Sequence, residues 1–325
     1  MLKRSILLWL ILSSLLAWFW PQWISGFDPF LACGPGAINV LIVVAMFAVG
    51  SLLPTAEVDL ILRRWPVVLG GTATQYICMP LLAFLVVRWL RPDAETATGI
   101  LIVGCVPGAM ASNVLTVTAR GNVSYSVSLT TLATLLSPII VPLMLWLVID
   151  RDVPYDGWKA LRLMLLQIVL PVISGHCLSR FSGAFRNRAE RQASGIANVA
   201  ILSIIAIAVA LNRSGVAQAS GWLIAVLALI NVCGYLSGYL GGTVLRLDEA
   251  MKRALTLEVG MQNAGAGVAL AKELFGADSP ALVPCILYTF GCMLTGTLLS
   301  TVWHSWSPNS LALPNSESGE ASRES

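Results

Sequence analysis

The sequence predicts an all-α membrane protein that crosses the bilayer about ten times, and three observations support this fold class. Of the 325 residues, 57% are hydrophobic and only 11% are charged, whereas soluble domains carry about 25% charged residues. Apolar runs of about 20 residues, the length with which a helix spans hydrocarbon, recur along the whole chain. No long polar stretch separates them, so we expect one membrane domain over 1–305 and no soluble domain.

The first apolar run, 5–24, has to be distinguished from a signal peptide because Lys3 and Arg4 precede it. A signal peptide has a shorter apolar region that ends at a small-residue cleavage site. This run is long, rich in Trp and lacks an A-x-A exit. We therefore interpret it as the first membrane-spanning helix.

Charged residues and Pro/Gly clusters delimit the spans that follow. These spans lie at 36–54, 66–88, 97–119, 123–149, 159–180, 194–212, 220–245, 249–275 and 281–303. The spans 220–245 and 249–275 are interrupted by glycine and polar residues. The end of the chain is rich in Ser, Glu and Asn, so we expect 306–325 to form a disordered polar tail.

The short connections between the spans predict the orientation. If the N-terminus is cytoplasmic, the inner connections hold twelve Lys and Arg residues and the outer connections hold seven. Cytoplasmic connections carry the excess of positive charge in membrane proteins. We therefore expect both termini on the cytoplasmic side of the cell membrane, as an even number of spans requires.

Ten spans divide into two sets of five, with repeat one at about 5–149 and repeat two at about 159–303. An odd-numbered repeat inserts its second copy upside down, as in many secondary transporters. The fourth span contains Pro107-Gly108-Ala109-Met110-Ala111-Ser112-Asn113, and the ninth contains Glu258-Val259-Gly260-Met261-Gln262-Asn263-Ala264-Gly265. Both are polar patches with glycine in an apolar helix, which favours an inverted repeat, although similarity alone does not establish one.

One carboxylate is the strongest functional signal. Of seventeen acidic residues, only Glu258 lies well inside a span. A charged carboxylate at mid-membrane costs roughly 2.5–3.5 kcal/mol on insertion scales. No Lys or Arg lies at a similar depth in the predicted spans, so a bound cation is the natural neutralising partner. The alternative is a neutral glutamic acid that is hydrogen-bonded to a neighbouring helix.

Oxygen-bearing side chains near Glu258 favour a cation. Gln262 lies one turn after Glu258 on the same helix face. Other polar side chains at span interiors are Gln75, Ser112, Asn113 and the stripe Ser126, Thr130 and Thr134. Such Ser and Thr residues often bond only their own backbone. Together, however, they supply hard oxygen ligands, which suit sodium and not a transition metal.

The glycines and Pro107 extend this interpretation to an anion. An unwound stretch exposes carbonyl groups for a cation and leaves a half-helix N-terminus, whose free N–H groups attract an anion. Discontinuous helices at the midplane mark the binding site in many transporters. The alternative is a packing kink in which small residues let helices approach closely. Two patches at corresponding positions favour the binding site.

Several function classes find no support. The net charge of +3 is scattered between apolar runs, which argues against nucleic-acid binding. The seven cysteines have no CxxC spacing and are interpreted as buried small hydrophobes. His176 and His304 are far apart and lack a carboxylate partner at depth, so a proton relay is not expected. Without GxSxG, HExxH or a second buried carboxylate, we expect neither catalytic residues nor an enzyme.

These motifs resemble those of the bile acid/sodium symporter family, and the resemblance extends to about residue 305. Its most specific parts are 104–113, Ala119-Arg120-Gly121-Asn122-Val123 leading into Ser126 and Thr130, and 258–263. The resemblance implies a ten-helix inverted-repeat fold in which the fourth and ninth spans are broken and cross at the midplane. It also implies a core of spans three, four, five, eight, nine and ten and a panel of spans one, two, six and seven.

The resemblance further implies two sodium sites and no cofactor other than these co-transported ions. One site would comprise Ser112, Asn113, Ser126, Thr130 and Glu258. The second would comprise Gln75, Glu258, Val259, Met261 and Gln262, in part through backbone carbonyls.

The candidate substrate residues include two departures from the family pattern. A Thr is typical where Met110 stands, and a Trp-His-Asn run is typical where Gly291-Cys292-Met293 stands. We therefore expect a small carboxylate, such as a keto acid or pantoate, at least as much as a bile acid. The expected contacts are Met110, Ala111, Asn263, Ala264 and Cys292.

The predicted function is thus sodium-coupled import of a small organic anion by alternating access in a lipid bilayer. The first alternative is a proton-coupled or exporting carrier of the same fold, with Glu258 as the proton carrier. An intramembrane enzyme is a remote alternative from another class.

Overall fold

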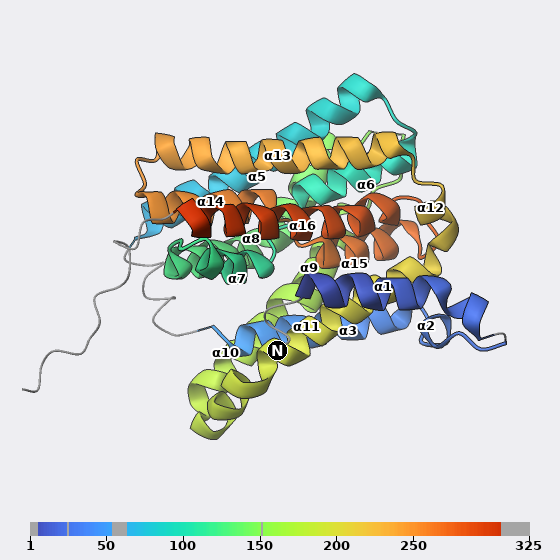
Figure 1. Ribbon diagram of the computed structural model, residues 1–325, viewed down its shortest axis with the longest axis horizontal. Coiled ribbons are helices and arrows are strands. Elements are labelled where there is room, and N and C mark those ends of the chain that lie inside the picture. The colour runs from blue at the N-terminus through green and yellow to red at the C-terminus, as the bar shows by residue number, and fades with distance from the viewer. Residues whose placement is uncertain (1–5, 25, 54–63, 151, 307–325) are drawn as a thin grey trace, which may run out of the picture.

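A computed structural model describes residues 6–24, 26–53, 64–150 and 152–306, and every regular element in these ranges is a helix (Figure 1). Six of the described helices are long and apolar enough to cross a membrane: 65–90, 123–148, 157–181, 183–211, 221–244 and 282–306. Shorter apolar helices lie at 7–23, 36–51 and 94–105. The expectation of an all-helical membrane protein is therefore confirmed. The predicted tail lies outside the described residues, apart from Trp306.

The helices follow the predicted spans closely. The first, second, third and fifth spans are α1 (Ile6–Trp23), α3 (Gly36–Ser51), α5 (Trp65–Leu90) and α8 (Val123–Val148). The sixth span consists of α9 (Gly157–Met164), the π-helical turn η2 (Leu165–Val169) and α10 (Leu170–Phe181). The seventh and eighth spans are α11 (Gly183–Leu211) and α13 (Gly221–Val244). The tenth is α16 (Leu282–Trp306). Short helices α2 (Pro29–Ala32) and α12 (Arg213–Ala217) lie in connections.

One boundary differs from the expectation, because α11 begins at Gly183 and not near 194. The early turns of α11 carry Arg186, Arg188, Glu190 and Arg191. Hydropathy excludes this segment from the apolar run, but charged residues do not prevent a helix outside the hydrocarbon. The hydroxyl of Ser182 accepts a hydrogen bond from Phe185 N at 3.3 Å and caps the extended helix.

The fourth and ninth spans are each interrupted. The fourth consists of α6 (Ala94–Cys105) and α7 (Ala111–Thr118), and the ninth consists of α14 (Glu249–Gly260) and α15 (Ala264–Phe275). Pro107 has no N–H to donate, and the residue before it, Val106, is extended with ψ 156°. Asn263 begins the second half-helix by accepting a hydrogen bond from Ala266 N at 3.1 Å.

The two interruptions hydrogen-bond each other. Ala109 N donates to the Met261 carbonyl at 2.7 Å, and Asn263 N donates to the Pro107 carbonyl at 2.8 Å. These bonds form an isolated antiparallel bridge between Gly108 and Gln262. Four of the backbone groups that the broken helices release are thus satisfied by the partner break, as an apolar environment favours.

The helices form two groups that lie side by side in Figure 1. In the first group, α3 packs against α10 and α11, and α11 packs against α1. In the second group, α13 packs against α14, α5 and α16, while α8 packs against α5, α7 and α14. The half-helix α15 belongs to the second group through α16 and α6, but it also contacts α3, α9 and α11.

Glycines set the close approach of helices within each group. In the first group, a Cβ on Gly175 of α10 would lie 2.2 Å from the Phe47 carbonyl oxygen of α3. In the second group, a Cβ on Gly238 of α13 would lie 2.7 Å from the Thr256 Cα of α14. Small residues at such crossings are typical of helix packing in membranes.

A polar cluster joins the two groups where α15 ends. Lys272 Nζ donates to the Pro35 carbonyl at 2.9 Å and to Asn39 Oδ1 at 2.6 Å, and it pairs with Glu273 Oε1 at 2.6 Å. Asn39 Nδ2 also donates to Glu273 Oε1 at 2.8 Å, and Lys159 Nζ donates to the Glu273 carbonyl. These five residues, here named the Lys272 cluster, tie α15 to the start of α3 and of α9.

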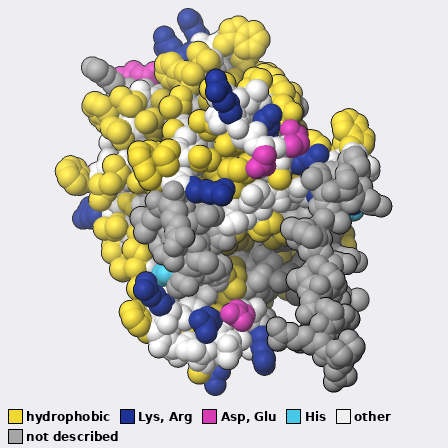
Figure 2. Space-filling model, turned by 90° about the vertical axis from the view of Figure 1, so that its left-hand side faces the viewer, with side chains coloured by type: hydrophobic (Ala, Val, Ile, Leu, Met, Phe, Trp, Pro, Cys, Tyr) yellow, Lys and Arg dark blue, Asp and Glu magenta, His cyan; other side chains and the backbone are white. Residues whose placement is uncertain are grey.

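Figure 2 shows the end of the molecule where α13 ends and α14 begins. Lys and Arg side chains are spread over this end among fewer Asp and Glu side chains, and hydrophobic side chains cover the flank beside them. Large exposed apolar residues of the described helices include Trp89, Trp146, Ile139, Leu240 and Val244. Exposed apolar flanks with charged ends are the distribution that a bilayer favours.

The tight crossing of α3 and α10 gives a stability prediction. Gly175→Ala places a methyl group against backbone atoms of α3 and should destabilise the protein by about 1–3 kcal/mol. The measurement is the melting temperature of the detergent-purified protein. Gly195→Ala in α11 is the matched control, because nothing lies within 4 Å of its Cβ position. Equal melting temperatures for both variants and the natural protein would contradict the packing argument.

Candidate functional site

Glu258 lies in the last turn of α14 and is 1% exposed. Its Oε2 accepts a hydrogen bond from Ser112 Oγ at 2.5 Å and another from Thr130 Oγ1 at 2.8 Å. Its Oε1 is buried and has no hydrogen-bond donor among the described residues. The carboxylate is therefore removed from solvent with one of its oxygens still free to accept.

The five residues expected for the first sodium site lie together. Asn113 Oδ1 accepts a hydrogen bond from Ser126 Oγ at 2.7 Å. Thr130 Oγ1, the donor to Glu258, lies 3.3 Å from the same Asn113 oxygen. Ser112 and Asn113 lie in the first turn of α7, directly after the interruption, and Ser126 and Thr130 share one face of α8. All five are buried. Thr134, further along the same stripe, contributes no hydrogen bond to this group in the part of the chain described.

The residues expected for the second site also meet at the crossing. Gln262 Oε1 accepts a hydrogen bond from Gln75 Nε2 at 3.4 Å, and Gln262 Nε2 donates one to the Val259 carbonyl at 3.0 Å. The Met261 carbonyl accepts the hydrogen bond from Ala109 N described above. Gln75 Oε1 is buried and finds no donor within the described ranges. Two buried acceptor oxygens without donors, on Gln75 and Glu258, are costly unless something else satisfies them.

Gly108 allows the carboxylate to lie against the first interruption. A Cβ on Gly108 would be 2.2 Å from Glu258 Oε1 and 2.7 Å from its Cδ. Any larger residue would therefore push the carboxylate away from Ser112 and Thr130. The absence of a side chain at Gly108 therefore makes room for the Glu258 carboxylate, and its backbone conformation does not itself require glycine.

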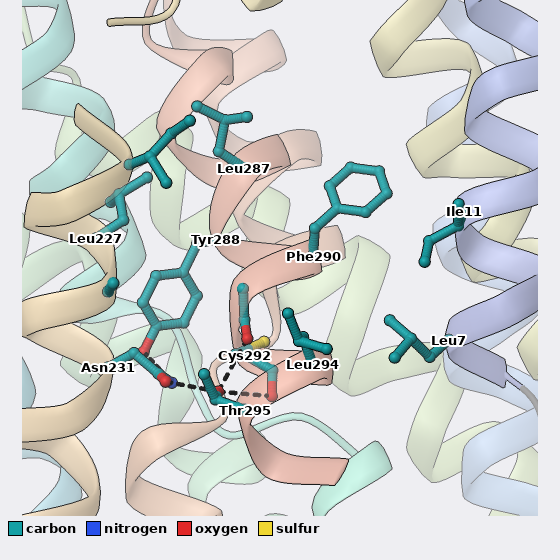
Figure 3. A pocket seen from close by; sticks show the side chains of 13 residues that line it. Leu7, Ile11, Leu227, Asn231, Leu287, Tyr288, Phe290, Cys292, Leu294 and Thr295 are labelled. Carbon is teal, nitrogen blue, oxygen red and sulfur yellow. Dashed lines mark hydrogen bonds between the residues drawn. The ribbon is translucent and has the colours of Figure 1, made fainter. Parts of the chain in front are cut away.

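The expected substrate residues do not all lie together, in contrast to the residues expected for the two sodium sites. Met110 and Ala111 are half-buried at the start of α7, and half-buried Asn263 caps α15. The side chain of Ala264 lies outside the described residues. Cys292 is 2% exposed on α16 and lines, with Gly291, a cavity of about 300 Å³ between α1, α13 and α16 (Figure 3).

Sequence reasoning missed three polar residues that touch the site. Thr116 Oγ1 lies 3.2 Å from Ser126 Oγ and is fully buried. Asn231 Nδ2 and Tyr288 OH both donate to the Gly260 carbonyl at 2.8 Å. Asn231 is a carboxamide in the middle of an apolar span, which is the same signal that identified Gln75. Thr116 and Tyr288 carry no comparable signal, because Thr and Tyr are common in apolar helices.

The arrangement suits a hard cation beside an anion site. One carboxylate, several hydroxyl and amide oxygens and the carbonyl ends of α6 and α14 meet at the crossing. The N-termini of α7 and α15 meet there too, and helix N-termini attract negative charge. No three His, Cys, Asp or Glu side chains gather as a metal site within the described ranges.

Comparison with known proteins identifies the family that the chain resembles. A model of the Sodium Bile acid symporter family matches residues 39–219. The uncharacterized sodium-dependent transporter YocS of Bacillus subtilis (strain 168) is 33% identical over 303 residues, which cover 91% of this chain and 89% of that protein. The probable sodium/metabolite cotransporter BASS1, chloroplastic, of Arabidopsis thaliana is 30% identical over 277 residues, covering 85% of this chain and 69% of that protein.

A third relative, the probable sodium/metabolite cotransporter BASS2, chloroplastic, of Oryza sativa subsp. japonica, is 29% identical over 305 residues and covers 91% of this chain and 69% of that protein. The family match spans more than half of the chain, and the bacterial relative aligns with nearly all of it. The resemblance inferred from the motifs is thereby confirmed. The chain belongs to the sodium bile acid symporter family and is a multi-pass membrane transporter, not an enzyme.

Proposed function

We propose that this protein is a sodium-coupled symporter that imports a small organic anion across the cell membrane by alternating access. The observation that carries the proposal is Glu258, a buried carboxylate with two hydroxyl donors on one oxygen and none among the described residues on the other. The names of the relatives, a sodium-dependent transporter and sodium/metabolite cotransporters, support sodium as the coupling ion.

Two sodium ions share Glu258 in this proposal. The first is coordinated by Ser112, Asn113, Ser126, Thr130 and Glu258, whose oxygens already lie within hydrogen-bond distance of one another. The second is coordinated by Gln75, Glu258 and Gln262 and by the carbonyl groups of Val259 and Met261. The free oxygens on Gln75 and Glu258 support this second assignment. A sodium ion on each side of the carboxylate would offset the cost of its burial.

The proposed architecture is ten spans in two inverted repeats within one domain over 1–305. Broken helices at the fourth and ninth positions, bonded to each other by two backbone hydrogen bonds, support this arrangement. The first helix group would be the panel, and the second would be the core. The end shown in Figure 2 would face the cytoplasm, together with both termini.

The anion would bind where the half-helices α7 and α15 begin, beside Ala111, Asn263 and Ala264. A carboxylate there faces two helix N-termini. Met110 and Cys292 would determine selectivity. Neither residue carries the polar group typical of bile acid carriers at these positions, so we propose a small carboxylate, such as a keto acid or pantoate, as the substrate.

Coupling two sodium ions to one monoanion would move one net positive charge inward. Each 100 mV of membrane potential would then contribute about 2.3 kcal/mol to accumulation. The rival within the same fold is proton coupling, with the proton on Glu258. Replacing sodium by choline at fixed pH separates the two mechanisms, since only the sodium symporter stops.

Sodium should stabilise the purified protein specifically. A ligand at 100 times its dissociation constant stabilises the folded state by about 2.7 kcal/mol. We therefore expect a higher melting temperature in sodium than in potassium, and a further rise with one class of organic anion. Glu258→Ala should lose the sodium response and sodium-dependent uptake while still inserting into the membrane. Identical melting temperatures in sodium and potassium, with and without anions, would refute sodium coupling.

Gly108→Ala should abolish sodium-dependent uptake although the substitution adds a single methyl group. The added Cβ would displace the Glu258 carboxylate and separate it from Ser112 and Thr130. Uptake into proteoliposomes and the sodium-induced change in melting temperature should both be lost. Gly221→Ala is the control, because nothing lies within 4 Å of its Cβ position. Normal uptake by Gly108→Ala would place the ion elsewhere.

Alternating access requires the two helix groups to separate at the Lys272 cluster. Asn39→Cys and Lys272→Cys, combined in a background without the seven natural cysteines that retains uptake, provide one thiol in each group. A short bifunctional thiol reagent should block uptake, and reduction should restore it.

The matched control links two positions within the first group. Phe47→Cys and Phe185→Cys replace rings whose centroids lie 6.0 Å apart on α3 and α11. Bridging this pair should leave uptake intact, since its helices move together. Continued uptake after complete bridging of positions 39 and 272 would show that the cluster stays closed during transport.

A further inference from the structure

Beside the candidate ion site, two side chains from neighbouring helices hold a single backbone carbonyl. Gly260 is the last residue of α14, so its carbonyl has no partner in its own helix. Asn231 Nδ2 of α13 and Tyr288 OH of α16 each donate to this oxygen at 2.8 Å. Both side chains are almost fully buried, with 2% and 1% of their surface exposed.

The Asn231 carboxamide is itself held in one orientation. Its Oδ1 accepts Thr295 Oγ1 at 2.7 Å, and its Nδ2 also lies 3.4 Å from Tyr288 OH. Tyr235 OH lies 3.1 Å from Thr295 Oγ1. Figure 3 shows Asn231, Tyr288 and Thr295 turned toward one another at the polar end of the otherwise apolar cavity. The network therefore favours the orientation in which the Asn231 amide donates to the Gly260 carbonyl.

Gly260 is also enclosed on its other side. A Cβ on Gly260 would lie 2.2 Å from the Tyr235 ring. The residue thus lies directly against this ring while its carbonyl is bonded to α13 and α16. The position of the peptide group at the end of α14 is determined by residues outside the candidate ion site.

The three successive carbonyl groups at this helix end consequently have different partners. The Val259 carbonyl accepts a hydrogen bond from Gln262 Nε2. The Gly260 carbonyl accepts hydrogen bonds from Asn231 and Tyr288. The Met261 carbonyl accepts a hydrogen bond from Ala109 N. The carbonyls on either side of Gly260 therefore remain with the residues of the crossing. Because each peptide group is planar, holding the Gly260 carbonyl restricts ψ of Gly260 and φ of Met261, the two dihedral angles that connect this peptide to the peptides carrying the Val259 and Met261 carbonyls.

We infer that Asn231 and Tyr288 are positioning residues for sodium binding. By holding the Gly260 carbonyl outside the site, they orient the Val259 and Met261 carbonyls toward the second ion. This inference rests on the proposed function. Asn231 and Tyr288 are not among the proposed sodium ligands, so their removal weakens sodium binding without removing an ion ligand.

The test is a sodium titration of the purified Tyr288→Phe and Asn231→Ala variants without substrate. The melting temperature is measured at each sodium concentration. Loss of one buried hydrogen bond should raise the half-saturating sodium concentration about three- to tenfold. Thr295→Val removes the donor to Asn231 Oδ1 and should shift the titration in the same direction by a smaller factor. This third variant preserves shape and remains informative if Asn231→Ala does not fold.

Tyr155→Phe is the matched control. Its hydroxyl also donates to a backbone carbonyl, that of Pro142 at 3.0 Å, but at the connection between α8 and α9. This variant should titrate like the natural protein.

The outcomes separate this inference from the proposed function. The positioning role would be overturned if Tyr288→Phe and Thr295→Val had the same half-saturating sodium concentration as the natural protein while Glu258→Ala lost the sodium-induced rise in melting temperature. The proposal of a sodium symporter would then still stand. A natural protein that does not respond to sodium would overturn both. An equal shift in Tyr155→Phe would show that the effect is a general loss of stability, which would also overturn the positioning role.

Discussion

The structure depends on how two broken helices satisfy their backbone in an apolar environment. Each interruption releases N–H and carbonyl groups, and hydrocarbon offers no water to bond them. The two hydrogen bonds between residues 107–109 and 261–263 meet part of this requirement, since each break serves as a partner of the other. The breaks must therefore face each other, and this requirement brings four half-helix ends to one place. The positions of α5 and α8 around the crossing then determine which side chains reach it.

The chemistry of the candidate site follows from that convergence. Two helix C-termini and one carboxylate concentrate negative charge at a point without solvent, and two helix N-termini lie beside them. Such a point favours a cation and an anion together over either one alone. Glu258 can approach the first break because Gly108 has no side chain. In the proposed symporter, the affinity for both solutes would thus have a common origin in helix geometry, which is a physical basis for coupling their transport.

Much of the fold and of the candidate site could be predicted from the sequence, because the residues that indicated them are unusual at their own positions. Glu258 stood out as the one acid inside a span, and Pro107 and the glycines marked the interruptions before any partner was known. The predicted span 194–212 leaves out the first turns of α11, because charged residues end an apolar run without ending a helix. Tyr288 and Thr116 were missed, because their importance comes from contacts across the fold that residue type does not encode. Sodium and substrate roles remain predictions at every position.

The half-helix α15 connects the candidate site to the boundary between the helix groups. Its cap, Asn263, lies in the crossing, and Lys272 of the cluster lies nine residues or about 14 Å further along the helix. A helix of this length is stiff, so a change in position at one end is transmitted to the other. The cluster is also expensive to separate, since Lys272 and Glu273 pair with each other and with Asn39 where little solvent reaches Lys272. Ligands at the crossing would therefore bias opening by adjusting a single rigid element, without any change in the packing of α3 against α10 and α11.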